Sequence, residues 1–237
     1  MARTLQAALG WVEIGGKLVH ESLADLTEEA FDAPTALPGW TRRHLTAHLA
    51  ANEEAVGNLI HWAATGVPTP MYASPQRRAG DIEEGSARTG ADLRGWFDSS
   101  ADQLVTAMAA LDAPQWAVEV QTAQGRVVPA SETPWMRARE LLVHAVDLNA
   151  GPTFQDLPTD FLQALGDDIA AQRSAAMSGP ALILQPADHT RPWTVEGTGT
   201  PTAVTGSLAD VVAYLAGRES AVTGTTGTAA PQLPAWL

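Results

Sequence analysis

The sequence predicts an α+β protein with an N-terminal four-helix bundle and a smaller C-terminal α/β domain. Four long segments with apolar residues at helical spacing fill roughly the first 150 residues. After Pro152 the pattern changes to short strand-like runs between turn residues. Apolar residues make up 45% of the 237 positions, which is enough to bury a core. We therefore expect two domains, 1–152 and 153–237.

The bundle is predicted from stripes of apolar residues that recur every three or four positions. The first three stripes are Leu5, Leu9, Val12, Val19 and Leu23; Leu45, Leu49, Val56, Leu59 and Ala63; and Leu93, Trp96, Phe97, Leu104, Met108 and Leu111. The fourth helix should begin near Thr133-Pro134 and run to about Asn149. These helices make a four-helix bundle with one long crossover the simplest arrangement.

The sequence also predicts where helices end and how they are connected. Thr41 is the expected N-cap of the second helix, and Gly66 marks its end. The connection from Gly66 to Gly90 is unusually long for a compact bundle, which often indicates a functional segment. The stretch 116–128 has strand or loop character.

The C-terminal part combines helices with short strands. A helix is expected around Phe161–Ile169, strands at 181–184, 193–196 and 202–205, and a further helix over 207–216. Ser207 and Asp210 occupy capping-box positions at the start of that last helix. This mixture indicates a small α+β domain.

Composition excludes several classes of function. The net charge of −13 argues against nucleic acid as a partner, because polyanion binding needs a basic field. No apolar run is long enough to span a membrane, and the first residues lack the pattern of a signal peptide, so we expect a cytoplasmic protein. The chain has no cysteine, so the sulfur for any thiol chemistry must come from a bound small molecule.

Polar residues interrupt the apolar face of the second helix. His48 and Asn52 fall inside the stripe, whereas His61 lies on the opposite face and His44 at the edge. Buried polar groups need partners, so both inward side chains require an explanation. A core histidine bonded to a backbone carbonyl is the simpler interpretation of His48 when it is taken alone.

The fourth helix supplies partners for His48. Glu140 and His144 are four positions apart and share a face, in a segment whose apolar residues imply burial on most sides. A buried glutamate needs a cation. One carboxylate and two imidazoles from two helices would make a three-ligand zinc site with an open fourth position. The alternative is an exposed helical pair of little energetic value.

Several sequence blocks resemble the family of mycothiol-dependent maleylpyruvate isomerases. They are Gly39-Trp-Thr-Arg-Arg-His-Leu-Thr-Ala-His48, His61-Trp-Ala-Ala-Thr-Gly66, Thr69-Pro-Met-Tyr-Ala-Ser-Pro75, Thr122-Ala-Gln-Gly-Arg-Val-Val-Pro-Ala-Ser-Glu-Thr133, Trp135-Met-Arg-Ala-Arg-Glu140, His144-Ala-Val-Asp-Leu148, Gly206-Ser-Leu-Ala, Ala216-Gly-Arg218 and Pro234-Ala-Trp-Leu237. The Gly-Trp-Thr…His pattern is typical of the broader DinB-like superfamily. The Thr-Pro-Met-Tyr and Ala-Gln-Gly-Arg blocks are narrower and favour the isomerase.

The resemblance implies a fold, a metal site and a reaction. The fold would be a DinB-like four-helix bundle followed by a smaller α/β domain. Zinc (Zn²⁺) would be held by His48, Glu140 and His144, and Arg218 would be a functional arginine. A cation that stabilises the end of its helix is the alternative for Arg218.

The implied reaction turns the dianionic, unsaturated keto acid maleylpyruvate into fumarylpyruvate, in gentisate breakdown and thus in aromatic catabolism. The thiolate of mycothiol would add to the double bond, allow rotation and leave. A fixed cation would stabilise the resulting enolate. Arg218 is our candidate for it, and Arg126 and Arg139 are weaker ones.

Three alternatives remain open at this stage. A mycothiol S-transferase would use the same zinc and thiol, and a zinc hydrolase would use bound water with Asp147 as base. A non-catalytic metal-binding module is the third, because fold does not fix function. We expect the only partners to be the small-molecule substrate and mycothiol, and the protein to be a monomer without membrane or nucleic-acid partners.

Overall fold

The computed structural model describes residues 3–224, 227–234 and 236, and it divides the chain into two compact units. One unit is Thr4–Pro152, and the other contains Thr153–Leu237 together with Met1–Arg3 at the N-terminus. The predicted fold class is confirmed, because the first unit is helical and the second contains a sheet. Among the quoted sequence blocks, positions 235 and 237 lie outside the described residues.

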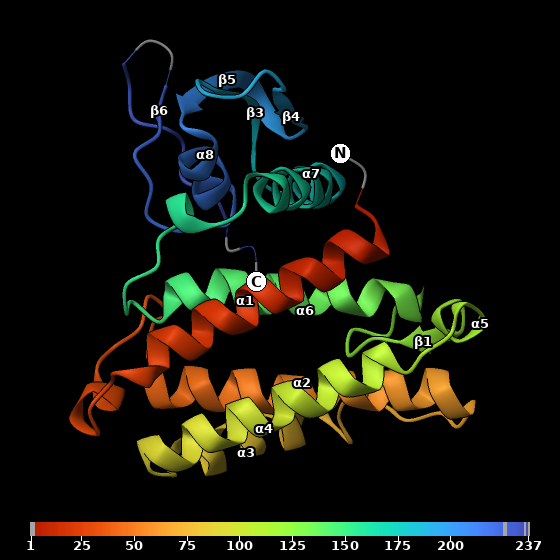
Figure 1. The fold of residues 1–237 in the computed structure, drawn as a ribbon. Helices are drawn as coiled ribbons and strands as arrows, with labels where there is room; N and C mark the ends of the chain where they lie inside the picture. Colours follow the sequence, from red (N-terminus) through yellow and green to blue (C-terminus); the bar gives the residue numbers. More distant parts are fainter. Residues whose placement is uncertain (1–2, 225–226, 235, 237) are drawn as a thin grey trace. The chain divides into compact units, whose positions relative to one another are not determined.

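Four long helices form the bundle of the N-terminal unit (Figure 1). They are α1 (Leu5–Ala24), α2 (Arg42–Thr65), α4 (Gly90–Ala109) and α6 (Thr133–Asp147). Helix α1 packs on α6, while α2 packs on both α4 and α6. The approach of α1 to α6 is close at Gly15, where an added Cβ would lie 2.7 Å from the Cβ of Leu141. The predicted stripes of α1, α2 and α4 lie mostly in the core, with Leu5, Leu9, Trp96 and Leu111 only partly buried.

Shorter elements complete the N-terminal unit. They are η1 (Glu29–Asp32), α3 (Pro75–Ser86), α5 (Ala113–Trp116), η2 (Ala130–Glu132) and the antiparallel pair β1 (Glu119–Gln121) and β2 (Val127–Pro129). Thr41 is the N-cap of α2, and Gly66, with a φ of 73°, ends it as predicted.

The expected long crossover is not a loop, because it contains α3, which packs along α2 (Figure 1). Ser74 caps this helix by accepting a hydrogen bond from the N–H of Arg77, and Pro75 occupies its first turn. The sequence does not predict α3, because Ile82 is the one large apolar residue on its buried face and a single residue makes no apolar stripe.

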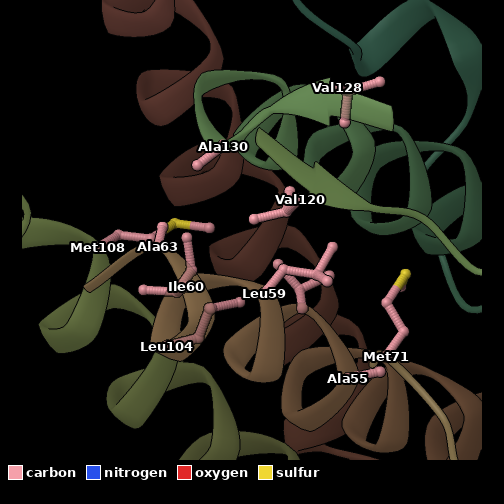
Figure 2. Close-up of a cluster of buried hydrophobic side chains, with 11 residues drawn as sticks. Ala55, Leu59, Ile60, Ala63, Met71, Leu104, Met108, Val120, Val128 and Ala130 are labelled. Carbon is pink, nitrogen blue, oxygen red and sulfur yellow. The ribbon is translucent and has the colours of Figure 1, made fainter. Parts of the chain in front are cut away.

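An apolar cluster joins α2, α4, the β1–β2 hairpin and the segment before α3. Figure 2 shows Met71 from that segment beside Ala55 and Leu59 of α2, with Val120 of the hairpin above them. Two polar contacts add to this packing: Asn58 Nδ2 donates to the carbonyl of Met71, and the N–H of Ala123 contacts the Met71 sulfur at 3.3 Å. The Thr-Pro-Met-Tyr and Ala-Gln-Gly-Arg blocks therefore meet in space.

The C-terminal unit holds a four-stranded sheet in the order β4-β3-β5-β6. Its elements are η3 (Phe154–Asp156), α7 (Thr159–Ala176), β3 (Pro180–Pro186), β4 (Trp193–Val195), β5 (Thr198–Gly206), α8 (Leu208–Leu215) and β6 (Thr223–Gly224). Strands β3 and β5 are parallel, and the other two pairs are antiparallel. Ser207 caps α8 by accepting from the N–H of Asp210, as predicted. In the part of the chain that the structure describes, every helix is too short or too polar to cross a membrane.

A buried polar network ties α6 to α2 and α4 inside the bundle. Arg137 is fully buried and pairs with Glu53, which is 2% exposed. The same guanidinium donates to Asn52 Oδ1 at 2.7 Å, and the Ser100 hydroxyl donates to Glu53. Because the bundle surrounds these groups with apolar side chains, each depends on its partner to remain in the core.

We predict that Arg137→Met destabilises the protein by about 3–5 kcal/mol, because it leaves Glu53 buried without its cation. Urea denaturation would measure this loss. The double variant Arg137→Met with Glu53→Leu should recover much of the stability, because both charged groups are then gone. The exposed Arg77→Met serves as the control. A loss below about 1 kcal/mol in the single variant would contradict the assigned role of the network.

Candidate metal centre

The first predicted ligand, His48, lies in the second turn of α2 and is only 4% exposed. The sequence just before the helix creates this environment. Gly39 has a φ of 80°, which permits the tight turn into α2. Trp40 then packs edge-on against the His48 ring, with 5.5 Å between ring centroids, and Thr41 caps the helix. The Gly-Trp-Thr block thus builds the helix start and shields the imidazole.

The remaining ligands come from α6, and the structure brings them to His48. Glu140 Oε2 lies 2.9 Å from His48 Nε2 and 3.3 Å from His144 Nε2. The two imidazole rings are nearly perpendicular, with centroids 5.2 Å apart. One ligand atom from each of the three residues can be chosen so that all lie within 4.8 Å of one another. The four-residue spacing of Glu140 and His144 therefore brings both side chains to His48 in one compact cluster.

Asp147 orients His144 from the far side of its ring. Its Oδ2 lies 2.8 Å from His144 Nδ1, and its side chain is almost completely buried. This contact leaves His144 Nε2 directed at Glu140. A carboxylate that fixes the tautomer and orientation of a ligating histidine is a common feature of metal sites. The sequence predicts Asp147 only as the base of an alternative hydrolase, and its contact with His144 is evident only in the structure.

The electrostatics of the cluster favour an ionised carboxylate. Burial alone would raise the pKa of Glu140, but the hydrogen bonds and charges of His144 and His48 hold it well below its ordinary value. Burial lowers the pKa of His48 despite its hydrogen bond with Glu140. Burial would also lower the pKa of His144, but Asp147 and Glu140 together raise it to about 9. Without a metal, the cluster at neutral pH therefore combines an ionised Glu140 and a neutral His48 with a protonated His144, and a metal bound there would displace that proton.

This donor set is the one that catalytic zinc uses: three protein ligands from imidazole and carboxylate, with room for a fourth. The ligands are carried by rigid helices, and Asp147 supplies the outer contact that such sites require. An external thiol or water could occupy the fourth position.

The other polar residues singled out in the sequence lie elsewhere. His61 is exposed, as predicted, and His44 is partly buried, with its ring near Thr41. Asn52 is buried and belongs to the Arg137 network. Arg126 lies exposed at the turn of the β1–β2 hairpin, and Arg139 packs near Trp135, with 5.8 Å from its guanidinium carbon to the ring centroid.

Arg218 belongs to the C-terminal unit, directly after α8. Its N–H donates to the Ala213 carbonyl, and Gly217, at a φ of 70°, donates to Tyr214. These two bonds are the Schellman pattern that ends a helix. The guanidinium donates to the carbonyl of Ala216 at 2.7 Å, so it also interacts with the negative end of the helix dipole.

Known proteins resemble this chain over its whole length. The model of the mycothiol maleylpyruvate isomerase N-terminal domain matches residues 16–149. Two solved structures of a mycothiol-dependent maleylpyruvate isomerase, one a variant with a histidine replaced by alanine, are each 39% identical to the chain. Each aligns with a TM-score of 0.93 over 99% of this chain and 98% of its own. No curated protein matches significantly. These similarities agree with the motifs and the fold, and the chain belongs to the mycothiol maleylpyruvate isomerase family.

Proposed function

We propose that this protein isomerises maleylpyruvate to fumarylpyruvate with zinc and mycothiol, as a cytoplasmic monomer in gentisate breakdown. The observation that carries the proposal is the cluster of His48, Glu140 and His144, whose ligand atoms lie within 4.8 Å of one another in a member of this family. The two similar structures are of a mycothiol-dependent maleylpyruvate isomerase, which supports the same assignment.

The three residues would hold zinc through two imidazole nitrogens and one carboxylate. Bound there, zinc would lower the pKa of a coordinating thiol and supply thiolate at neutral pH. Asp147 keeps His144 in the required tautomer. Trp40 and the bundle core restrict water around His48, which strengthens the electrostatic interactions within the cluster.

Turning a carbon–carbon double bond requires its bond order to fall temporarily. Reversible addition of the external thiolate achieves this, because the carbon–sulfur bond forms while the former double bond becomes single and rotates. The electron pair moves onto the conjugated ketone oxygen and returns when the sulfur leaves, so atoms and charge balance. The protein must hold the substrate and stabilise the developing oxyanion.

Arg218 is our proposed cation for that oxyanion. Its guanidinium is permanently charged and planar, which suits an enolate or a carboxylate oxygen. The Schellman turn at Gly217 fixes its backbone, and its side chain remains partly exposed. The helix-end interaction with Ala216 is the competing explanation.

Two other enzymatic functions compete with isomerisation. An S-transferase would use the same metal and thiol and would differ only in its product, so a product assay separates the two. A thiol-independent hydrolase is less well supported, because Asp147 contacts His144 Nδ1 and is almost fully buried, which suits an orienting role better than that of a base.

Variants of the proposed ligands test the metal site. His48→Ala and Glu140→Gln should each lose most of the bound zinc, because each removes one of three ligands. Elemental analysis of the purified variants would measure this. His61→Ala, an exposed histidine of the same helix, should retain full zinc content. Full occupancy in both ligand variants would refute the three-residue site.

A turnover assay tests the proposed function directly. Zinc-loaded protein should convert maleylpyruvate to its trans isomer only when mycothiol is added, since the chain contains no cysteine. Chromatography of the product would follow the conversion. Turnover in thiol-free buffer would contradict the proposal, and a stable thioether product would indicate an S-transferase.

The kcat of Arg218 variants tests the proposed role of this residue. Arg218→Ala should keep the fold and zinc but lower kcat on the order of a hundredfold, the scale of a lost transition-state interaction. Arg218→Lys should recover activity only in part, because lysine lacks the planar fork. Arg191→Ala, a surface arginine of the same unit, is the matched control. An unchanged kcat would assign Arg218 to the helix end alone.

A further inference from the structure

The segment between α2 and α3 contains a cation that the preceding mechanism does not use. Arg78 lies in the first turns of α3, with its side chain partly buried, and its guanidinium carbon lies 5.9 Å from the centroid of the Tyr72 ring. Tyr72 belongs to the Thr-Pro-Met-Tyr block, one of the two narrow sequence blocks for which the metal cluster gives no explanation.

The position of this block is fixed by its neighbour. Met71 is buried in the apolar cluster, where Figure 2 shows its side chain beside α2. Asn58 donates to the carbonyls of Pro70 and Met71, and Ala123 contacts the Met71 sulfur. The backbone that carries Tyr72 is therefore held against α2 on one side and the hairpin on the other.

Tyr72 lies on the side of α2 that carries His48. Asn52 comes one helical turn after His48, and its side chain is close enough to Tyr72 to affect the pKa of the phenol. Since Asn52 Oδ1 accepts a hydrogen bond from Arg137, its Nδ2 is the group left to face Tyr72. Burial raises the pKa of Tyr72, and the charges of both Arg78 and Glu140 act on it. The phenol is thus near both Arg78 and Glu140 of the cluster.

The surroundings of Arg78 differ from those of Arg77, its neighbour in α3. Arg77 is exposed and forms an ion pair with Asp81 at 2.6 Å. No carboxylate within the described residues is ion-paired with Arg78, which instead borders the Tyr72 ring. The segment that carries Arg78 runs along α2 from Met71, which is hydrogen-bonded to Asn58, to Glu83, which lies 3.9 Å from His44, and His48 lies within that stretch of α2. A cation beside the cluster without a protein carboxylate is suited to an anionic ligand.

We infer that Arg78, seated against Tyr72, binds a carboxylate of the substrate and so selects dianionic acids over neutral electrophiles. This inference rests on the proposed function and extends it. A dianionic substrate brings two carboxylates to the site, and the reaction adds charge on a ketone oxygen. Arg218 can serve only one of these groups at a time, whereas Arg78 supplies a second planar donor within the unit that carries the metal ligands.

Steady-state kinetics of Arg78→Ala would test the inference. Its KM for maleylpyruvate should rise on the order of tenfold or more, the effect of losing a charge-assisted hydrogen bond, while its KM for mycothiol and its zinc content stay unchanged. Arg78→Lys should lie between the two, and Arg77→Ala, the same change one position earlier, should match the native enzyme. An unchanged KM for maleylpyruvate, or an equal rise in the KM for mycothiol, would overturn the assignment.

A binding measurement separates this inference from the proposed function. Calorimetric titration of the zinc-loaded protein with maleate, a simple cis-dicarboxylate, requires neither turnover nor thiol. The native protein and Arg77→Ala should bind maleate equally, and Arg78→Ala at least tenfold more weakly. If the native protein proves inactive, this result still decides the role of Arg78. Equal affinity in all three proteins, or no binding by the native protein, would overturn it.

Discussion

The buried ion pair between Arg137 and Glu53 is the interaction on which the metal centre depends. Glu53 follows His48 by little more than one turn of α2, and Arg137 precedes Glu140 by about one turn of α6. The pair therefore fixes the register of the two helices directly beside the ligands. Because an unpaired charge in the core is so unfavourable, other registers of α6 on α2 are excluded. The three proposed ligands are in consequence held together by the fold itself.

A second clamp closes the opposite end of the same helix pair. Arg42, at the start of α2, donates to the carbonyls of Leu148 and Asn149, which follow the end of α6. The N–H of Ala36 donates to the carbonyl of Asp147. The ligands lie between this clamp and the Arg137 network, so both ends of the shared interface are fixed by polar groups. Apolar packing alone would allow sliding, because it has little directional preference.

The clustering of the three proposed ligands could be predicted from the sequence because the evidence for it is local. His48, Glu140 and His144 are polar residues on apolar helix faces, and a helical period is enough to find them. Arg137 could not be found in this way, because its burial depends on Glu53, 84 positions away. Helix α3 has no apolar stripe, so a helical period cannot reveal it, and Ser74 and Pro75 alone are too weak a signal of a helix start. Two-residue strands such as β6 carry no periodic signal at all.

The division between broad and narrow motifs has a physical basis in the structure. The broad Gly-Trp-Thr…His block builds the start of α2 and the first ligand, which any metal chemistry on this bundle would need. The two narrow blocks supply none of the proposed ligands, and they meet where Ala123 contacts the sulfur of Met71. That contact and the surrounding apolar cluster hold Tyr72 near Asn52 and Arg78, and our inference places these residues at the substrate. On this proposal, a change in the ligands would abolish metal binding for every substrate, whereas a change in Tyr72, Asn52 or Arg78 would alter only which molecule is held. Discrimination among reactions of the same metal centre is therefore expected to depend on the residues around Tyr72. The sequence features that distinguish one family from its superfamily should cluster there.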